Sequence, residues 1–168
     1  MTIEENARPC TLVVMGPAGA GKSTIGEAVA KRLGAPFYEG DAFHPPENVA
    51  KIRSGEGLNA DDRRPWIAAI GTAISNDAPS FSVLACSALN GEIRELLHAA
   101  LPGDVRFVLL DVPEAELLRR LEAREGHFAG PSLLRSQLDA MDAAEDVARV
   151  DGQLSVDELV DAVVRFVP

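Results

Sequence analysis

The sequence predicts an α/β protein in which helices cover both faces of one parallel β-sheet, a three-layer arrangement. Apolar, strand-like runs alternate with segments of helical periodicity along the whole chain, as in repeated strand–helix–strand units. The runs 10–15 and 81–86 are apolar almost throughout, which is typical of strands buried on both faces. The 168 residues contain no repeat and no linker, so we expect a single domain, residues 1–168, with residues 1–9 as a flexible tail.

Glycine, proline and capping residues set the boundaries of the predicted elements. Gly34 follows the first helix and suits the position just after a helix C-terminus. Pro113 can open a helix because proline is tolerated in the first turn, and Ser132 can cap the next one. Ser155 and Glu158 have the spacing of a capping box. The predicted strands are 10–15, 36–39, 81–86, 106–110 and 147–150, and the predicted helices are 22–33, 46–54, 61–75, 92–101, 113–125, 132–141 and 155–166.

The stretch GPAGAGKS between the first strand and the first helix matches the phosphate-loop pattern G-x-x-x-x-G-K-[ST]. Its glycines allow backbone conformations in which successive N–H groups turn toward one anion. Lys22 adds a positive charge for the β- and γ-phosphates, and the Ser23 hydroxyl suits Mg²⁺. The motif therefore predicts binding of ATP and Mg²⁺. The loop residues predicted to bind ATP are Gly16, Pro17, Ala18, Gly19, Ala20, Gly21, Lys22, Ser23 and Thr24.

Ligands of such sheets bind at the carboxyl ends of the strands, so residues that directly follow a strand are candidates for the site. Asp41 follows the second strand, and its carboxylate could accept a proton from a substrate hydroxyl or hold a Mg²⁺-bound water. The alternative is that Asp41 only closes a Gly-Asp turn. Ser87 and Asp111 follow the third and fourth strands. His44 precedes two prolines, a position that on its own favours a structural role.

Three arginines are candidates for binding anionic groups. Arg63 lies near the start of a predicted helix, from which it could reach an anionic substrate. Arg120 and Arg124 are four residues apart, so we expect them on one helix face, at the base of a glycine-containing flap. Such a pair could close over ATP and stabilise charge on the transferred phosphoryl group. The alternative is a solvated helix face with ion pairs such as Glu116–Arg120.

The composition argues against several classes of partner. The formal net charge of −10 argues against DNA or RNA, because affinity for a polyanion comes mostly from Lys and Arg. The apolar run that follows the first residues is too short for a signal or membrane segment, so we expect no membrane contact. Cys10 and Cys86 match no metal or redox spacing, which favours reduced thiols and a cytoplasmic location.

Longer motifs add a resemblance to a known family. The run from Gly40 to Trp66, GDAFHPPENVAKIRSGEGLNADDRRPW, resembles that of the bacterial-type gluconokinases, small-molecule kinases with a phosphate loop that are similar to shikimate kinases. CSAL at 86–89, Arg94 and RLEAREGHF at 120–128 extend the similarity. The residues of the first run that match the family pattern are Gly40, Asp41, His44, Pro45, Asn48, Lys51, Gly55, Leu58, Asp62, Arg63, Pro65 and Trp66.

The resemblance implies a P-loop kinase fold with strand order 2-3-1-4-5, a small lid around 120–131 and a homodimer. It also implies transfer of the ATP γ-phosphoryl group to the 6-hydroxyl of D-gluconate. The implied catalytic residues are Lys22, Asp41 and Arg124. Arg120 and Arg124 would join the ATP site, and Ser23 and Asp41 would hold the metal. The residues implied for the acceptor are Asp41, His44, Lys51, Arg63 and Ser87.

Several residues depart from the family pattern. Ala60 and Asn90 each remove a charge near the expected acceptor site, so another sugar acid or a shikimate-like acceptor is an alternative. A non-catalytic nucleotide-binding protein and an NTP-hydrolysing switch are further alternatives, and the retained Lys22 speaks against the first of them. The departures are Gly57 for proline, Ala60 for aspartate, Asn90 for lysine, Ile93 for tyrosine, and Asp142-Ala143 for the Glu-Pro after the lid helix.

Overall fold

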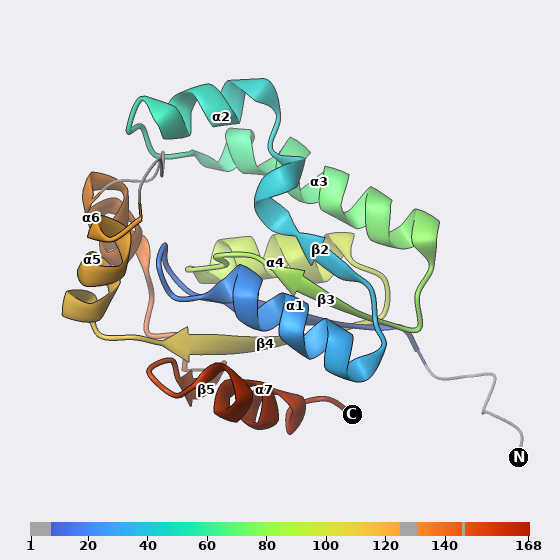
Figure 1. The fold of residues 1–168 in the computed structure, drawn as a ribbon. Helices are drawn as coiled ribbons and strands as arrows, with labels where there is room; N and C mark the ends of the chain where they lie inside the picture. The colour runs from blue at the N-terminus through green and yellow to red at the C-terminus, as the bar shows by residue number, and fades with distance from the viewer. Residues whose placement is uncertain (1–7, 125–130, 146) are drawn as a thin grey trace, which may run out of the picture.

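Five parallel strands form one sheet in a computed structural model that describes residues 8–124, 131–145 and 147–168 (Figure 1). The sheet order is β2-β3-β1-β4-β5, and each neighbouring pair is parallel. This confirms the predicted sheet and its order. The strands are β1 (Cys10–Met15), β2 (Phe37–Glu39), β3 (Phe81–Ala85), β4 (Asp104–Asp111) and β5 (Ala148–Asp151).

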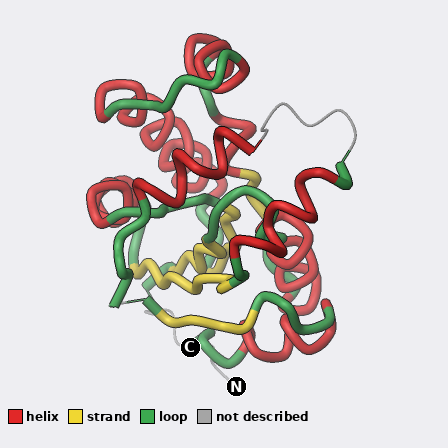
Figure 2. The backbone as a smooth tube through the Cα atoms, turned by 90° about the vertical axis from the view of Figure 1, so that its left-hand side faces the viewer, coloured by secondary structure: helices red, strands yellow, loops and turns green. Residues whose placement is uncertain are grey.

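Helices cover the two faces of the sheet and give the predicted three layers (Figure 2). Successive residues of a strand point to opposite faces, so Leu12 and Val14 pack against α1 and α7, while Val13 and Met15 pack against α3 and α4. The helices are α1 (Lys22–Leu33), the 3-10 helix η1 (Gly40–Phe43), α2 (Pro46–Arg53), α3 (Ala60–Asp77), α4 (Gly91–Ala100), α5 (Glu114–Glu122), α6 (Pro131–Ala140) and α7 (Val156–Val164).

Most predicted helices differ from the observed ones by one or two residues at an end, and two of these differences affect site or capping predictions. The predicted helix 132–141 begins at Pro131, so Ser132 lies in its first turn and is not its cap; proline suits this place because its φ is already helical. The predicted helix 113–125 ends at Glu122, with Pro113 as its N-cap residue. Arg124 therefore lies beyond α5, and the prediction that it shares a helix face with Arg120 is wrong.

Other boundaries agree with the sequence signals. Gly34 ends α1 with a left-handed φ of 64°, and Ser155 with Glu158 forms the capping box of α7. α3 starts at Ala60 because Asn59 and Asp62 form a capping box that the sequence analysis did not identify.

Some predictions concern residues that the structure does not describe. Residues 1–7 of the predicted tail and residues 125–130 of the predicted lid lie outside the described residues. Pro9 belongs to the fold, because its carbonyl accepts a hydrogen bond from the Asp104 N–H at 2.8 Å. Across residues 8–124, 131–145 and 147–168, no helix has both the length and the apolar character needed to span a membrane.

Candidate active site

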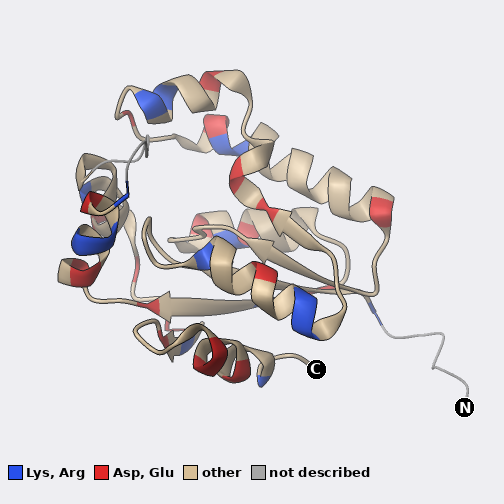
Figure 3. Cartoon of the chain, viewed as in Figure 1, with Lys and Arg blue, Asp and Glu red and all other residues tan. Residues whose placement is uncertain are grey.

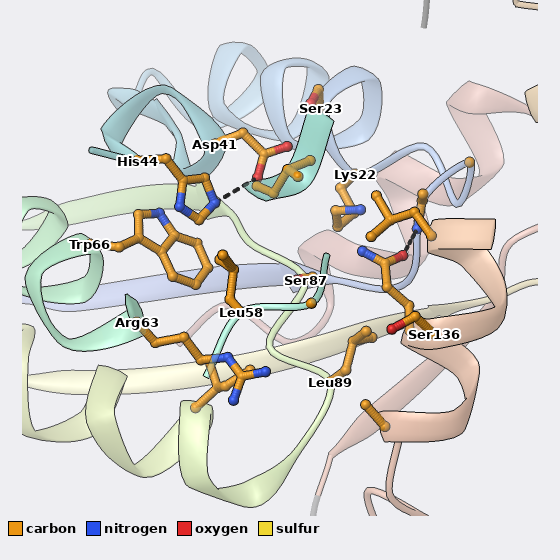
Figure 4. Close-up of a pocket in the computed structure, with 18 of the residues that line it drawn as sticks. Lys22, Ser23, Asp41, His44, Leu58, Arg63, Trp66, Ser87, Leu89 and Ser136 are labelled. Carbon is orange, nitrogen blue, oxygen red and sulfur yellow. Dashed lines mark hydrogen bonds and ion pairs between the residues drawn. The ribbon is translucent and has the colours of Figure 1, made fainter. Parts of the chain in front are cut away.

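A cavity of about 460 Å³ lies at the carboxyl edge of the sheet. Its walls come from the loop after β1, the turns after β2 and β3, the start of α3, and one face of α6 (Figure 4). It therefore brings together segments that the sequence analysis treated as separate candidates. The predicted site residues that line it are Ala18, Gly19, Gly21, Lys22, Ser23, Thr24, Asp41, His44, Arg63, Ser87 and Arg124.

The phosphate loop has the backbone conformation that its glycines predict. Gly19 and Gly21 have φ values of 88° and 96°, in a backbone region that residues with a Cβ rarely adopt. Lys22 Nζ donates to the Pro17 carbonyl at 3.1 Å, which folds the lysine back over the loop. Burial lowers the pKa of Lys22, and the carboxylates of Asp41 and Glu39 oppose this shift. The loop thus holds a partly desolvated cation within reach of two carboxylates.

Glu39 is a site residue that the sequence analysis missed. It is the last residue of β2, lines the cavity, and accepts a hydrogen bond from the Ser23 hydroxyl. The sequence analysis predicts site residues only after the strands, whereas Glu39 shows that a polar side chain at the carboxyl end of a strand is also a signal. Ser23, Glu39 and Asp41 provide the oxygen ligands that Mg²⁺ prefers.

These oxygen ligands fit a magnesium ion that is also bound by a nucleotide. The part of the chain that the structure describes has no group of three or more His, Cys, Asp or Glu side chains that could hold a metal ion alone. Mg²⁺ commonly keeps several waters and uses one or two protein ligands together with substrate phosphates. The residues present therefore suit a metal that arrives with ATP.

Asp41 is held by the packing of the turn that follows β2. Trp66 Nε1 donates to the Gly40 carbonyl at 2.8 Å, and the Trp66 and His44 rings stack with centroids 4.2 Å apart. His44 Nε2 lies 3.7 Å from Asp41 Oδ1 (Figure 4). Burial lowers the pKa of His44, with Asp41 opposing the shift, so the imidazole is neutral at neutral pH. The Asp41 side chain itself is 72% exposed and lines the cavity.

Lys51 and Arg63 take different places, although both were predicted to bind the acceptor. Lys51 Nζ donates to both Asp62 oxygens, at 3.0 and 2.8 Å, so it joins α2 to α3 and does not line the cavity. Arg63 lines the cavity, on the side where Leu58 and Trp66 also lie (Figure 4). Figure 3 shows Lys and Arg on α2 and at the start of α3, and among the basic residues of these two helices Arg63 lines the cavity.

Arg120 and Arg124 are separated by the end of α5. Arg120 donates to the Gly19 carbonyl and the Gly152 carbonyl, both at 3.2 Å, and forms the expected ion pair with Glu116 at 2.9 Å. It therefore supports the outer side of the phosphate loop and does not line the cavity, whereas Arg124 does line it. Of the two predicted lid arginines, Arg124 has the position from which a phosphate could be reached.

Asp111 is a strand-end candidate that the structure places outside the site. It is the last residue of β4, it pairs with Asp151 of β5, and its carboxylate lies 3.5 Å from Arg149. It does not line the cavity. A role as a magnesium-holding residue of an NTP-hydrolysing switch therefore has no support in its position.

One face of α6 forms a wall that the sequence analysis did not identify. Leu133, Ser136, Gln137 and Ala140 line the cavity, with the spacing of a single helix face. Ser136 lies on the side of the cavity opposite Asp41 and His44 (Figure 4). Gln137 Oε1 accepts a hydrogen bond from the Ala18 N–H of the phosphate loop at 2.7 Å. The sequence signal for this wall is the spacing of apolar and polar residues along the helix.

Three of the four single-residue departures from the family pattern line the cavity. They are Gly57, Asn90 and Ile93; Ala60 does not line it. Asn90 caps α4, since its side chain accepts from the Ile93 N–H at 3.0 Å. The substitutions at 57, 90 and 93 therefore change the cavity wall directly, while Ala60 acts only as the first residue of α3.

Comparisons with known proteins find kinases that are similar to this chain in sequence and in structure. The sequence model of the shikimate kinase family matches residues 18–157. A gluconokinase from Gluconobacter oxydans (strain 621H) is 42% identical over 94% of this chain and 91% of its own. The crystal structure of a gluconokinase from Sinorhizobium meliloti 1021 is 41% identical, with a TM-score of 0.80, over 94% of this chain and 90% of that one. A sugar kinase from Janibacter sp. HTCC2649 has 35% identity and a TM-score of 0.82, over 94% of each chain.

Proposed function

The chain belongs to the gluconokinase family, and from this premise we propose that it is an enzyme that transfers the γ-phosphoryl group of ATP to D-gluconate. The proposed product is 6-phosphogluconate, formed at the 6-hydroxyl. The observation that carries the proposal is one cavity lined by the phosphate loop, by Asp41 and by Arg63. In this proposal, the loop binds the triphosphate, Asp41 accepts a hydrogen bond from the substrate hydroxyl, and Arg63 binds the carboxylate of the sugar acid.

In the proposed reaction, the triphosphate lies in the loop 16–23 and the acceptor lies between Asp41 and Arg63. A bond forms between the acceptor oxygen and the γ-phosphorus while the bond from that phosphorus to the β–γ bridging oxygen breaks. The hydroxyl proton passes to Asp41, and ADP leaves. Lys22 and Arg124 balance charge on the transferred group, because phosphoryl transfer depends mainly on positioning and electrostatics.

Ser23, Glu39 and Asp41 are the residues that would hold the magnesium ion of this proposal together with the nucleotide. When bound, Mg²⁺ neutralises charge on the β- and γ-phosphate oxygens. The Ser23–Glu39 hydrogen bond supports this assignment, because it holds the hydroxyl and a carboxylate next to each other at the cavity wall.

The experiment that tests the function measures ADP production from Mg·ATP with D-gluconate, related aldonic acids, shikimate and no acceptor. We expect strong stimulation by gluconate. Stimulation by another sugar acid alone would keep the reaction and replace the acceptor, consistent with the altered residues Gly57, Asn90 and Ile93. Binding of ATP with no stimulation by any acceptor would contradict the proposal.

Arg63→Met should raise the KM for gluconate by about ten- to a hundredfold and leave the KM for ATP within about threefold. A charge-assisted hydrogen bond contributes about 1.5 to 3 kcal/mol, and methionine removes it while keeping much of the side-chain volume. Arg64→Met is the matched control, since the neighbouring Arg64 is 67% exposed and pairs with Asp61. An equal rise in both KM values would show that Arg63 does not bind the acceptor.

Arg124→Ala should lower kcat by about ten- to a hundredfold, because a fixed donor to the transferred phosphoryl group is lost. The KM for gluconate should change little. Arg135→Ala on α6 serves as control, since Arg135 is 61% exposed and pairs with Glu114 and Asp139. Steady-state kinetics at saturating gluconate make the comparison. Unchanged kcat would remove Arg124 from the mechanism.

The oligomeric state and the location are separate parts of the proposal. We infer a homodimer and a cytoplasmic enzyme from the family, and light scattering of the purified chain tests the first. A monomer that phosphorylates gluconate at full rate would contradict the dimer and leave the catalytic proposal intact.

A further inference from the structure

The side chain of Gln137 joins α6 to the phosphate loop. Its Oε1 accepts the Ala18 N–H at 2.7 Å, a contact between residues 119 positions apart in the sequence. α6 is itself held in place, because Leu134 is buried at 1% exposure and packs against the same apolar cluster as α5. The amide group of Gln137 is therefore held between two fixed elements at the wall of the cavity.

The hydrogen bond to Ala18 determines which way the Gln137 amide points. If oxygen and nitrogen were exchanged, the NH₂ group would face the Ala18 N–H, donor against donor. With Oε1 on Ala18, the two Nε2 hydrogens lie next to the loop and must donate to something else. Within the described ranges, Nε2 has no protein acceptor. Because Gln137 is only partly buried and lines the cavity, its Nε2 can donate to a bound ligand that takes the place of water.

The position of Ala18 indicates which group of a ligand accepts the hydrogen bond from Nε2. Lys22 and Ser23, at the start of α1, lie at the far end of the loop, where the helix N-terminus meets the phosphates. Ala18 lies in the first half of the loop and lines the same cavity as Asp41 and Arg63. A donor held on Ala18 thus faces the one cavity that the triphosphate site and the acceptor site share. The group that passes between these sites is the γ-phosphoryl group.

We propose that Gln137 is a further catalytic residue whose Nε2 donates a hydrogen bond to the γ-phosphoryl group of ATP. The Ala18 N–H holds Oε1 and so fixes the orientation of the amide. This rests on the proposed kinase function. A neutral donor placed in advance stabilises charge on the transferred group without adding a cation beside Lys22 and Arg124.

Two substitutions separate donation from anchoring. Gln137→Glu keeps an oxygen that accepts the Ala18 N–H, but it has no donor and places a charge toward the γ-phosphate. We expect kcat with gluconate to fall at least tenfold, and the affinity for ATP to fall at least tenfold more than that for ADP, which lacks the γ-phosphate. Gln137→Leu removes both groups, and we expect a similar loss of kcat with less effect on ATP binding.

Arg135→Gln is the matched control, because it makes the same change of net charge on the same helix, at a 61% exposed residue. We expect it to change kcat and both affinities less than threefold. The measurements are steady-state kinetics and calorimetric titration of ATP and ADP, with circular dichroism to check folding. If Gln137→Glu keeps kcat while Gln137→Leu loses it, anchoring of α6 is the role of Gln137 and the inference is wrong.

An equal loss of ATP and ADP affinity in Gln137→Glu would also overturn the inference, because it would place the amide away from the γ-phosphate. The nucleotide titrations need no acceptor, so they test Gln137 even if gluconate is not the substrate. Failure of the wild-type chain to use any acceptor in the substrate panel would instead contradict the proposed function.

Discussion

Replacing Asp41 by asparagine should lower kcat for gluconate phosphorylation by about a hundredfold to ten-thousandfold, the usual range for loss of a general base. Asparagine has nearly the same size and can still accept a hydrogen bond from the acceptor hydroxyl. It cannot take up the proton, and it removes a negative charge from the neighbourhood of Lys22. ATP affinity should nevertheless stay within about threefold, because the phosphate loop, Lys22 and Ser23 are unchanged.

The matched control for Asp41→Asn is Asp61→Asn. Asp61 lies in the first turn of α3, is 86% exposed and pairs only at the surface with Arg64, so its loss should leave kcat within about twofold. Initial rates at saturating ATP and gluconate, with calorimetric titration of ATP, make the comparison. A kcat for Asp41→Asn within threefold of wild type would mean that Asp41 only closes the turn after β2.

The fold was predictable because its signals are local. Continuous apolar runs identify strands buried on both faces, and Gly34 or the Ser155–Glu158 pair mark helix ends by their own backbone chemistry. The errors arose where two local signals compete. Pro131 and Ser132 can each start a helix, and the structure uses the proline. The order of the strands came from family resemblance, since no local signal determines which strands are neighbours.

The site was predictable only in part, because a motif names residues without saying which partners they contact. The phosphate loop could be recognised since its function depends on backbone geometry that glycine encodes. Lys51 carried the same motif evidence as Arg63, but Asp62 lies close enough to bind it. Gln137 lies 119 residues from its partner Ala18, so only the packing of α6 reveals their contact.

Asp142→Asn should lower the free energy of unfolding by about 2 to 3 kcal/mol. Both carboxylate oxygens of Asp142 accept from Arg94 Nη2, at 3.0 and 2.9 Å, and they also accept from the N–H groups of Gly91 and Ala144. The Arg94 side chain is only 6% exposed, so loss of the charge leaves a buried cation poorly compensated. The expected value is below the about 3 to 5 kcal/mol of a fully buried pair, because Asp142 is 39% exposed.

The pH dependence distinguishes an ion pair from a packing effect at this position. Burial opposes ionisation of Asp142, but the hydrogen bonds from Arg94 and Gly91 outweigh it and lower its pKa. Since the folded-state pKa lies below the unfolded value of about 4, the stabilisation is complete above pH 4 and is lost as pH falls through the lowered pKa. Urea unfolding should thus give a constant difference between wild type and Asp142→Asn from pH 7 to 5, which narrows below pH 4. A difference that persists at low pH would indicate packing.

Asp139→Asn is the control, since Asp139 is 63% exposed and its pair with Arg135 should contribute less than about 1 kcal/mol. The double variant Arg94→Met, Asp142→Leu should regain much of the lost stability, because apolar side chains can replace a buried pair. The pair also links the segment after α6 to the N-terminus of α4. One face of α6 and the first turn of α4 with its cap residue Asn90 line the cavity. We therefore expect Asp142→Asn to lower kcat/KM by a larger factor than it lowers the fraction of folded protein. If kcat/KM falls only by the factor lost in folded protein, α6 is positioned without this ion pair.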